Sequence, residues 1–271
     1  MPAPGISLDC LTLLDQPAPE LVRIAGRTGY AMVSLWVQEP ILPFGALASP
    51  SDESTLLRTL AETGVGVGNL EVFNLASDHP IDAFEPALAF GARLGAKTAT
   101  AIDYGDRSTA EIAERLAGFC RLAASYGLGV NVEPISMSRT ATVRDAATLI
   151  RAAGSPDCGI VLDMLHFVRT GSSLADLAAL EEETIRYVQL CDGPIPVDED
   201  HFAVEATEER LDPGEGDFPI AAVLERLPER VQLAVEVPAF RRRRALGIGA
   251  ERHAALAMEA ALKLLARART G

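Results

Sequence analysis

A repeat of about 30 residues constrains the fold of this chain more than any other feature of its sequence. Eight short runs are almost continuously apolar, as is typical of parallel strands that are covered on both faces. Most of the gaps between the ends of successive runs are close to the length of one strand–helix–strand step. The runs are Gly5–Asp9, Tyr30–Trp36, Val65–Asn74, Ala96–Asp103, Leu128–Glu133, Gly159–Asp163, Ile185–Asp192 and Val231–Pro238.

The segments between these runs carry helix signals. Ser108 and Glu111 have the spacing of a capping box, and apolar residues follow them at helical intervals from Ile112 to Tyr126. Gly127 predicts the end of that helix just before the next strand. We predict further helices over Asp52–Glu62, Pro80–Leu94, Thr142–Ala153, Ser172–Leu180, Phe218–Leu227 and Ala250–Arg269.

Eight strand–helix units predict an α/β fold, a single (β/α)₈ TIM barrel that closes its sheet and leaves no edge strands. An open doubly wound sheet is the alternative, but it would need a Gly-rich phosphate turn after an early strand, and no GxGxxG occurs there. No linker or low-complexity tract interrupts the chain. We therefore predict one barrel domain over residues 1–271.

The charge and the cysteines narrow the function classes. The sequence has 24 Lys and Arg against 38 Asp and Glu, a formal net charge of −14, which disfavours nucleic acid and anionic membrane surfaces as partners. No apolar run approaches the roughly 20 residues of a membrane helix, and the first residues do not resemble a signal peptide. The four cysteines are scattered without zinc-type spacing, so we predict reduced thiols in a cytoplasmic protein.

Four polar residues interrupt apolar runs where strands five to eight end: Glu133, Asp163, Gln189 and Glu236. In a barrel, the carboxyl ends of the strands converge on one site. Three converging carboxylates repel one another unless their pKa values rise or a cation binds between them. The hard oxygen set favours Mn²⁺ or Mg²⁺, with Co²⁺ as a further candidate, over zinc, because no His or Cys joins the four. A single such acid is more often solvated or salt-bridged.

The order of several motifs resembles the sugar phosphate isomerase/epimerase superfamily of xylose isomerase-like barrels. An Asp-x-x-His step joins Asp163 to His166, and Gln189 follows in the next strand. The segment 210–216 has the form R-x-x-P-G-x-G, and Glu236 lies in the last strand. Hydroxypyruvate isomerase, the tagatose 3-epimerases and the inosose and 3-dehydroshikimate dehydratases belong to this superfamily.

The resemblance implies roles for six residues. Glu133, Asp163, Gln189 and Glu236 would ligate a divalent metal, and His166 and Arg210 would contact the substrate. The epimerases usually have His in place of Gln189, whereas the hydroxypyruvate isomerase branch has Gln, which favours an isomerase. The related zinc endonucleases need more than the four histidines of this chain. The resemblance also implies a homodimer or homotetramer.

The chemistry that these residues support is proton transfer beside a carbonyl. A metal polarises the C=O and stabilises an enediolate, while Glu133 removes a proton and Glu236 can return one from the other side, or the reverse. This predicts an isomerase or epimerase of a small hydroxy-carbonyl compound, a polyhydroxylated sugar or a sugar derivative. A lyase that dehydrates a hydroxy-ketone such as a 3-dehydroshikimate- or inosose-like compound is the alternative. A barrel that only binds a ligand is the third.

Several other residues have two interpretations. His166 could instead be a hydrogen-bonded residue at a helix start, and Arg210 could pair with a nearby acid at 205, 208 or 209. The run 241–244 of four arginines could attract an anionic substrate or form a solvated face or subunit contact. Trp36 and Phe73 could line the cavity or belong to the core. Asp103 and Asp192, which also end strands, could support the site through hydrogen bonds.

Overall fold

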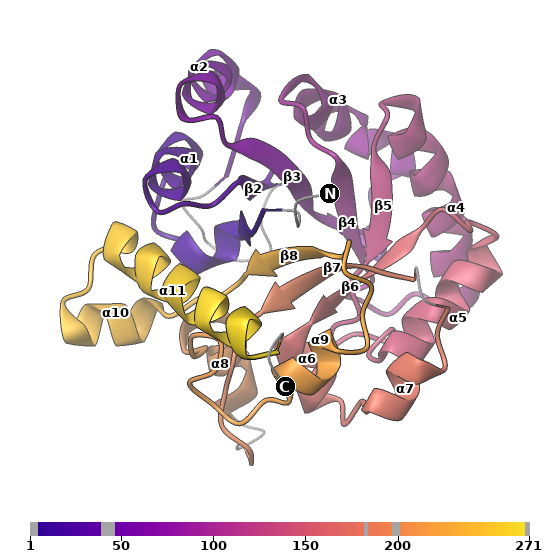
Figure 1. Ribbon diagram of the computed structural model, residues 1–271. Coiled ribbons are helices and arrows are strands. Elements are labelled where there is room, and N and C mark those ends of the chain that lie inside the picture. The colour runs from indigo at the N-terminus through magenta and orange to yellow at the C-terminus, as the bar shows by residue number, and fades with distance from the viewer. Residues whose placement is uncertain (1–4, 39–46, 182–183, 197–200, 269–271) are drawn as a thin grey trace.

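The structure is a computed structural model that describes residues 5–38, 47–181, 184–196 and 201–268. Eight parallel strands close into a barrel in chain order, which confirms the predicted (β/α)₈ fold (Figure 1). The first strand closes the barrel, because Ser7 lies opposite Met32 on one side and Ala234 on the other. The strands are β1 Ser7–Leu8, β2 Met32–Trp36, β3 Gly66–Asn74, β4 Thr98–Ile102, β5 Gly129–Val132, β6 Gly159–Asp163, β7 Ile185–Leu190 and β8 Gln232–Val235.

Helices surround the strands as the outer layer (Figure 1). The α-helices are α1 Ala18–Arg27, α2 Glu53–Thr63, α3 Glu85–Arg93, α4 Thr109–Ser125, α5 Val143–Ala153, α6 Met164–Arg169, α7 Leu174–Ala178, α8 Phe202–Glu208, α9 Ile220–Leu224, α10 Phe240–Leu246 and α11 Ala250–Ala268. Three short 3₁₀ helices are η1 Cys10–Leu13, η2 Pro50–Asp52 and η3 Ile81–Phe84. All the predicted helices are present in the described segments, although the range 80–94 divides into η3 and α3, and residue 269 lies outside them.

The capping box predicted from Ser108 and Glu111 forms at the start of α4. Ser108 Oγ accepts a hydrogen bond from the Glu111 N–H, and the Glu111 carboxylate accepts one from the Ser108 N–H in return. Gly127 ends this segment with a φ of 72°, a conformation that costs glycine little. The buried face of α4 includes Ile112 and Leu116, the stripe that the helical spacing predicted.

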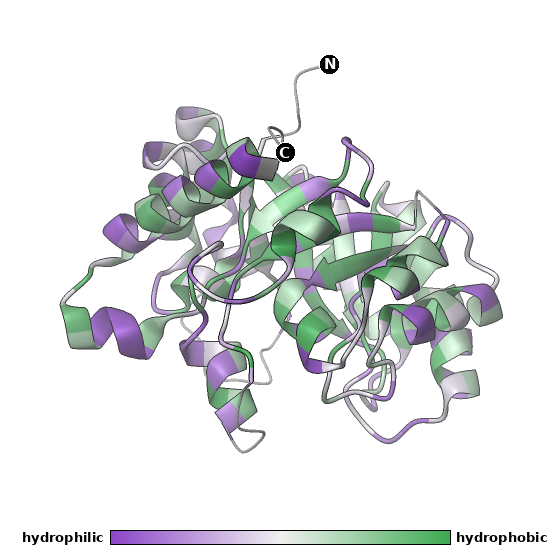
Figure 2. Ribbon diagram, turned by 60° about the horizontal axis from the view of Figure 1, so that its bottom comes forward, coloured by the Kyte–Doolittle hydropathy of each residue, from purple (hydrophilic) through white to green (hydrophobic). Residues whose placement is uncertain are grey.

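Apolar strands and amphipathic helices make the core. Figure 2 shows green, hydrophobic strands inside and helices that alternate between purple and green outside. Leu21, Leu70 and Leu116 are completely buried between the sheet and its helices. Among the helices that the structure describes, none is long and apolar enough to cross a membrane.

An irregularity in β3 matters for the site. The pairing of β3 with β4 shifts register between Leu70 and Phe73. Leu70 lies against α3, where a Cβ on Gly91 would come within 2.1 Å of its Cδ1, and Phe73 packs against Phe119 of α4. The two residues between them, Glu71 and Val72, both line the cavity described below. A bulge of this kind redirects side chains that simple strand alternation would place on opposite faces.

Candidate metal centre and active site

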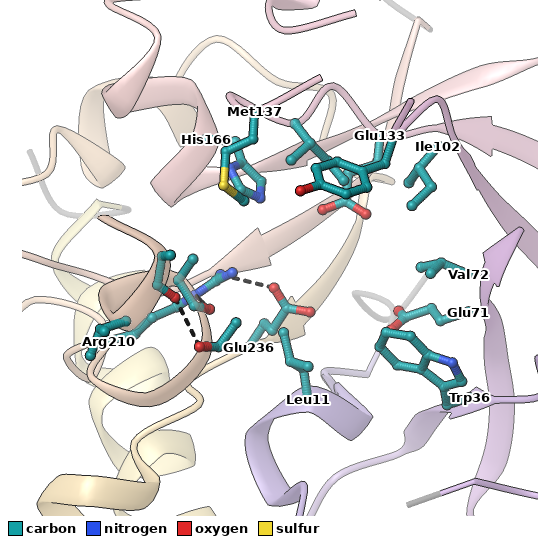
Figure 3. Close-up of a pocket in the computed structure, with 16 residues that line it drawn as sticks. Leu11, Trp36, Glu71, Val72, Ile102, Glu133, Met137, His166, Arg210 and Glu236 are labelled. Carbon is teal, nitrogen blue, oxygen red and sulfur yellow. Dashed lines mark hydrogen bonds and ion pairs between the residues drawn. The ribbon is translucent and has the colours of Figure 1, made fainter. Parts of the chain in front are cut away.

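A cavity of about 420 Å³ lies over the carboxyl ends of the strands (Figure 3). This is the end of a TIM barrel where active sites form. Polar residues from β3, from the ends of β5 and β8, and from α6, α8 and the segment after α8 contribute to its lining. They are Glu71, Glu133, His166, Thr207, Arg210 and Glu236, and Tyr104, which follows β4, adds a phenol to the lining.

The structure brings the four residues predicted as metal ligands to this end of the barrel. Asp163 is the last residue of β6 and lies opposite Gln189 of β7 in the sheet register. Glu133 and Glu236 directly follow β5 and β8, and their backbone N–H groups continue the sheet pairing, to Ala101 O and Leu190 O. All four side chains are buried. Gln189 Nε2 donates to Glu236 Oε1 at 2.9 Å, so neighbouring strands are linked at the site itself.

Arg210 occupies the centre of this group. Its Nη1 lies 2.6 Å from Asp163 Oδ2 and 2.8 Å from Glu236 Oε2, and its side chain is 2% exposed. The Arg210 Nε donates to Ala206 O of α8, which fixes the guanidinium from behind. The predicted substrate residue therefore lines the cavity and also bridges two predicted metal ligands.

The acids that the sequence offered as alternative partners of Arg210 pair elsewhere. Glu205 accepts from Arg169, Glu208 from Arg241, and Glu209 lies against His201. Arg210 instead reaches acids on two strands that are distant in the chain. Sequence proximity could not identify these partners, because the barrel brings them together only when it closes.

The Asp-x-x-His step has a clear structural role. Asp163 caps α6, and its Oδ1 accepts from the backbone N–H groups of Leu165 and His166 at 2.6 and 3.2 Å. This cap holds Asp163 and places His166 in the first turn, with His166 Nδ1 3.1 Å from Ser136 Oγ. One donor atom each of Glu133, Asp163 and His166 lies within 4.8 Å of the others. His166 is therefore placed to bind either a substrate or a metal, and the objection to zinc that no His lies near the set does not hold in the folded chain.

Burial and like charge dominate the electrostatics. Burial and the charge of Asp163 raise the pKa of Glu133 to about 8. Burial also raises the pKa of Glu236 well above its usual value, in spite of the attraction of Arg210. Burial opposes ionisation of Asp163 too, but Arg210 outweighs it and lowers the pKa of that carboxyl. Burial lowers the pKa of His166 to about 4, so its imidazole is neutral at physiological pH.

Two further acids belong to this cluster, and the sequence interpretation missed both. Asp9, directly after β1, is completely buried, accepts from Ser34 Oγ at 2.5 Å and lies 3.3 Å from Gln189 Nε2. Glu71 lines the cavity and accepts from Asn69 Nδ2 and from the Cys10 thiol. Asp9 directly follows β1, so the rule that selected the four predicted residues, a polar residue where a strand ends, finds it when applied to strand one. Glu71 lies three residues before the end of β3, so the same rule does not find it.

Of the two aromatic residues and two further strand-end acids considered in the sequence, only one lines the cavity. Trp36 lines the cavity, whereas Phe73 belongs to an aromatic cluster between the barrel and its helices. Asp103 accepts from the N–H and hydroxyl of Thr140. Asp192 accepts from the backbone N–H groups of Gly193, Gly214 and Phe218, the last two of which lie after α8. Both acids hold loops and make no hydrogen bond to the four predicted ligands in the described structure.

The arginine run forms α10 and is largely engaged in ion pairs. Arg241 pairs with Glu208, Arg242 with Asp212, and Arg243 with Asp15. The fourth arginine lies over the ring of Phe240. These contacts favour a structural role for the run over attraction of an anionic substrate.

The side chains fit a divalent cation. In the described part of the chain, five carboxyl groups converge here, on Asp9, Glu71, Glu133, Asp163 and Glu236, and one guanidinium, that of Arg210, faces them. Gln189 Oε1 is buried without a hydrogen-bond partner among the described residues, an acceptor that a cation would satisfy. Carboxylates, an amide oxygen without a hydrogen-bond partner and a nearby imidazole are groups that bind divalent metal ions in proteins.

Comparison with known proteins agrees with this architecture. The family of xylose isomerase-like TIM barrels matches residues 22–266, and the chain belongs to this family. No curated protein sequence matches the chain. Similar solved structures include an IolI protein with a bound zinc atom, which has a TM-score of 0.79 and 17% identity and covers 98% of this chain and 100% of its own.

Two other similar structures carry different activities in their names. A D-allulose 3-epimerase from Methylomonas sp. has a TM-score of 0.71 and 16% identity, covering 97% of this chain and 98% of its own. A probable 3-DHS dehydratase, AsbF, from Bacillus anthracis has a TM-score of 0.70 and 14% identity, covering 94% and 97%. At these identities the likeness shows a shared fold. Structures named as an epimerase and as a probable dehydratase therefore share one barrel fold with this chain.

Proposed function

We propose that the protein is a divalent-metal-dependent isomerase or epimerase of a small hydroxy-carbonyl compound, a sugar or a sugar derivative. One observation carries the proposal: Glu133 and Glu236 reach a single cavity from different sides, among more buried carboxyl groups than one guanidinium can neutralise (Figure 3). Two such groups can remove a proton beside a carbonyl and return it from the other side.

We assign the metal to Glu133, Asp163, Gln189 and Glu236, with His166 as an additional donor within reach. The donors are compatible with Mn²⁺, Mg²⁺ or Co²⁺, and His166 adds Zn²⁺ to these. When bound, such an ion would polarise the substrate carbonyl and lower the proton affinity of the surrounding carboxylates.

The chain's own residues supply the proton transfer. Glu133 and Glu236 remove a proton from the carbon beside the substrate carbonyl and return one. Between the two transfers the substrate is an enediolate. Arg210 holds Asp163 and Glu236 in fixed positions through its two short contacts. The neutral imidazole of His166 can donate a hydrogen bond to a substrate oxygen or accept one from a hydroxyl. The surrounding barrel excludes bulk water from these groups.

A metal-dependent dehydratase of a hydroxy-ketone is the second candidate, and the similar structure named as a probable 3-DHS dehydratase supports it. A substrate with a hydroxyl group on the carbon next to the enolate can lose that group. The same enolate chemistry then ends in loss of water instead of reprotonation.

The test is incubation of ketoses and cyclic hydroxy-ketones with the protein and Mn²⁺ or Zn²⁺ in D₂O. Deuterium incorporation without loss of water supports the isomerase or epimerase, and an enone absorbance supports the dehydratase. Glu236→Gln should abolish either reaction. Glu208→Gln is the matched control, because Glu208 is a partly exposed acid of α8 whose partner is Arg241. Turnover by Glu236→Gln at the wild-type rate would remove Glu236 from the mechanism, and absence of exchange with any compound would favour a barrel that only binds a ligand.

Metal dependence is tested separately by elemental analysis of the purified protein, EDTA treatment and add-back. We expect about one divalent ion per chain, lost from Glu236→Gln and kept by Glu208→Gln. The free state of all four cysteines is consistent with our proposal that the enzyme works in the cytoplasm. We also propose that it forms a homodimer or homotetramer, which sedimentation analysis can measure.

A further inference from the structure

Much of the cavity wall away from Arg210 is apolar. The described residues of this wall come from η1, from the β2, β3 and β4 strands, from the segment after β5, and from α8. Large apolar side chains on this wall are Leu11, Trp36, Val72, Ile102 and Met137, which Figure 3 labels, together with Ile135. The polar groups, by contrast, come mainly from the strand ends around Arg210. Glu71 and Tyr104 also line the cavity, so it combines one polar region with a mainly apolar wall.

Helix α8 extends this wall. Ala203, Val204 and Ala206 line the cavity, and α8 presents no charged side chain there. Thr207 also lines it, but its hydroxyl already donates to Ala203 O within the helix. The acids of α8 point elsewhere, since Glu205 pairs with Arg169 and Glu208 with Arg241.

A substrate with hydroxyl groups along its whole length fits this wall poorly. Each hydroxyl placed against hydrocarbon loses its hydrogen bonds to water without replacement. An added hydroxyl in an apolar pocket weakens binding by up to roughly 100-fold. A hydrocarbon group in the same place gains roughly fourfold per buried methylene.

We propose that the substrate is a hydroxy-ketone whose hydroxy-carbonyl end lies at the carboxylates and whose other end is an alkyl or cyclic hydrocarbon group packed on this apolar wall. The inference rests on the proposed function, and it narrows the substrate from sugars in general to compounds with one oxygenated end. The polar region at Glu133, Glu236, His166 and Arg210 is sufficient for a single hydroxy-carbonyl unit.

The single tryptophan of the chain provides a direct assay. Trp36 lines the cavity, so its fluorescence reports occupancy without turnover. The probes share one end and stay open-chain: erythrulose, 1-hydroxy-2-butanone and 1-hydroxy-2-hexanone. We expect 1-hydroxy-2-butanone to bind at least about tenfold more tightly than erythrulose, which adds two hydroxyls. We expect 1-hydroxy-2-hexanone to gain roughly another 15-fold from two further methylenes.

Two variants locate the effect on the wall. Met137→Gln and Val72→Thr keep the side-chain size and add polar atoms, so each should reduce the gain from butanone to hexanone at least threefold. Met137 is 47% exposed, so its replacement should leave folding intact. Leu57→Gln is the matched control, since Leu57 is 42% exposed on α2 outside the cavity, and it should leave all three affinities unchanged.

Erythrulose binding as tightly as 1-hydroxy-2-butanone, or a hexanone affinity equal to that of the butanone, would overturn the inference. Deuterium exchange in D₂O, with metal added, distinguishes failure of this inference from failure of the proposed function. Exchange of erythrulose alone would refute the apolar preference and keep the chemistry. Tight binding of the apolar ketones with no exchange in any probe would keep the preference and refute the chemistry.

Discussion

Replacement of Arg210 by methionine tests the charge balance of the site most directly. The Arg210 side chain is 2% exposed, and its Nη1 contacts Asp163 and Glu236, whose side chains are 0% and 4% exposed. Methionine fills much of the same volume but brings no charge or donor. The change leaves two buried acids facing each other without a cation.

The expected cost follows from the burial of the pair. Removing one partner of a buried ion pair destabilises a protein by about 3–5 kcal/mol, because the remaining charge is neither solvated nor compensated. Most of this loss should fall on Asp163, since Arg210 is what lowers the pKa of that carboxyl. Without Arg210 the pKa of Asp163 should rise, so the loss should shrink as the pH falls and the carboxyl takes up a proton.

The assay is urea unfolding of wild type and Arg210→Met at pH 7, with EDTA and then with Mn²⁺ or Zn²⁺. In EDTA the variant should lose about 3–5 kcal/mol. A bound cation at 100 times its dissociation constant adds about 2.7 kcal/mol to any protein that binds it only when folded. The gain should be larger in the variant than in wild type, because there the cation also replaces the missing positive charge.

Arg243→Met is the control. The Arg243 side chain is also buried, with 7% exposed, but its partner Asp15 is 33% exposed and can be hydrated after the change. We expect a loss of about 1 kcal/mol that does not depend on metal. An Arg210→Met protein as stable in EDTA as Arg243→Met, or one whose stability does not respond to metal more than wild type does, would refute this view of the site.

Three other changes address the framework of the barrel. His253 Nε2 lies 2.8 Å from Val237 O, and burial lowers its pKa to about 4, so His253 should contribute a loss of stability of about 1.4 kcal/mol per pH unit as the pH falls from about 6.5 to 4; His253→Leu should lose that part of the slope in urea unfolding, and an unchanged slope would contradict the assignment. Gly91→Ala brings a Cβ to 2.1 Å from Leu70 Cδ1 and should cost about 1–3 kcal/mol, measured by thermal unfolding; a neutral effect would mean that α3 shifts freely. Ser108→Ala removes the cap of α4 and should cost about 1 kcal/mol, which Ser108→Asp should largely restore.

The barrel was predictable because its signals are local. Each buried parallel strand is a continuous apolar run, and each amphipathic helix has its own period, so the order of eight units follows from the sequence alone. The bounds were less accurate, as at β1, where the run Gly5–Asp9 contains a strand of two residues. The short helices α8 and α10 were missed, since one or two turns give too short a period to detect, and α1, a helix of 10 residues, was missed as well.

The site was predictable to the extent that it depends on strand ends. Glu133, Asp163, Gln189 and Glu236 follow from the topology once the barrel is assumed. Glu71 does not follow as simply, because the register shift in β3 places it and Val72 on the same cavity, and alternation alone cannot show that. The partners of Arg210 also depend on the closed barrel, which no local pattern encodes.

Gln189 suits the proposed metal site both with and without a cation. In this structure its Nε2 donates to Glu236 Oε1 and lies near Asp9, so the amide serves as a donor among acids while its own oxygen is left without a partner. An amide carries a donor and an acceptor on one planar group, and rotation about a single side-chain bond exchanges them. A glutamate at this position could only add to the repulsion among the five carboxyl groups. A neutral histidine has a single N–H group, whereas the amide nitrogen of Gln189 has two. Glutamine therefore supports the acids through its N–H groups when Arg210 is their cation, and it can offer its oxygen when a metal ion shares that role.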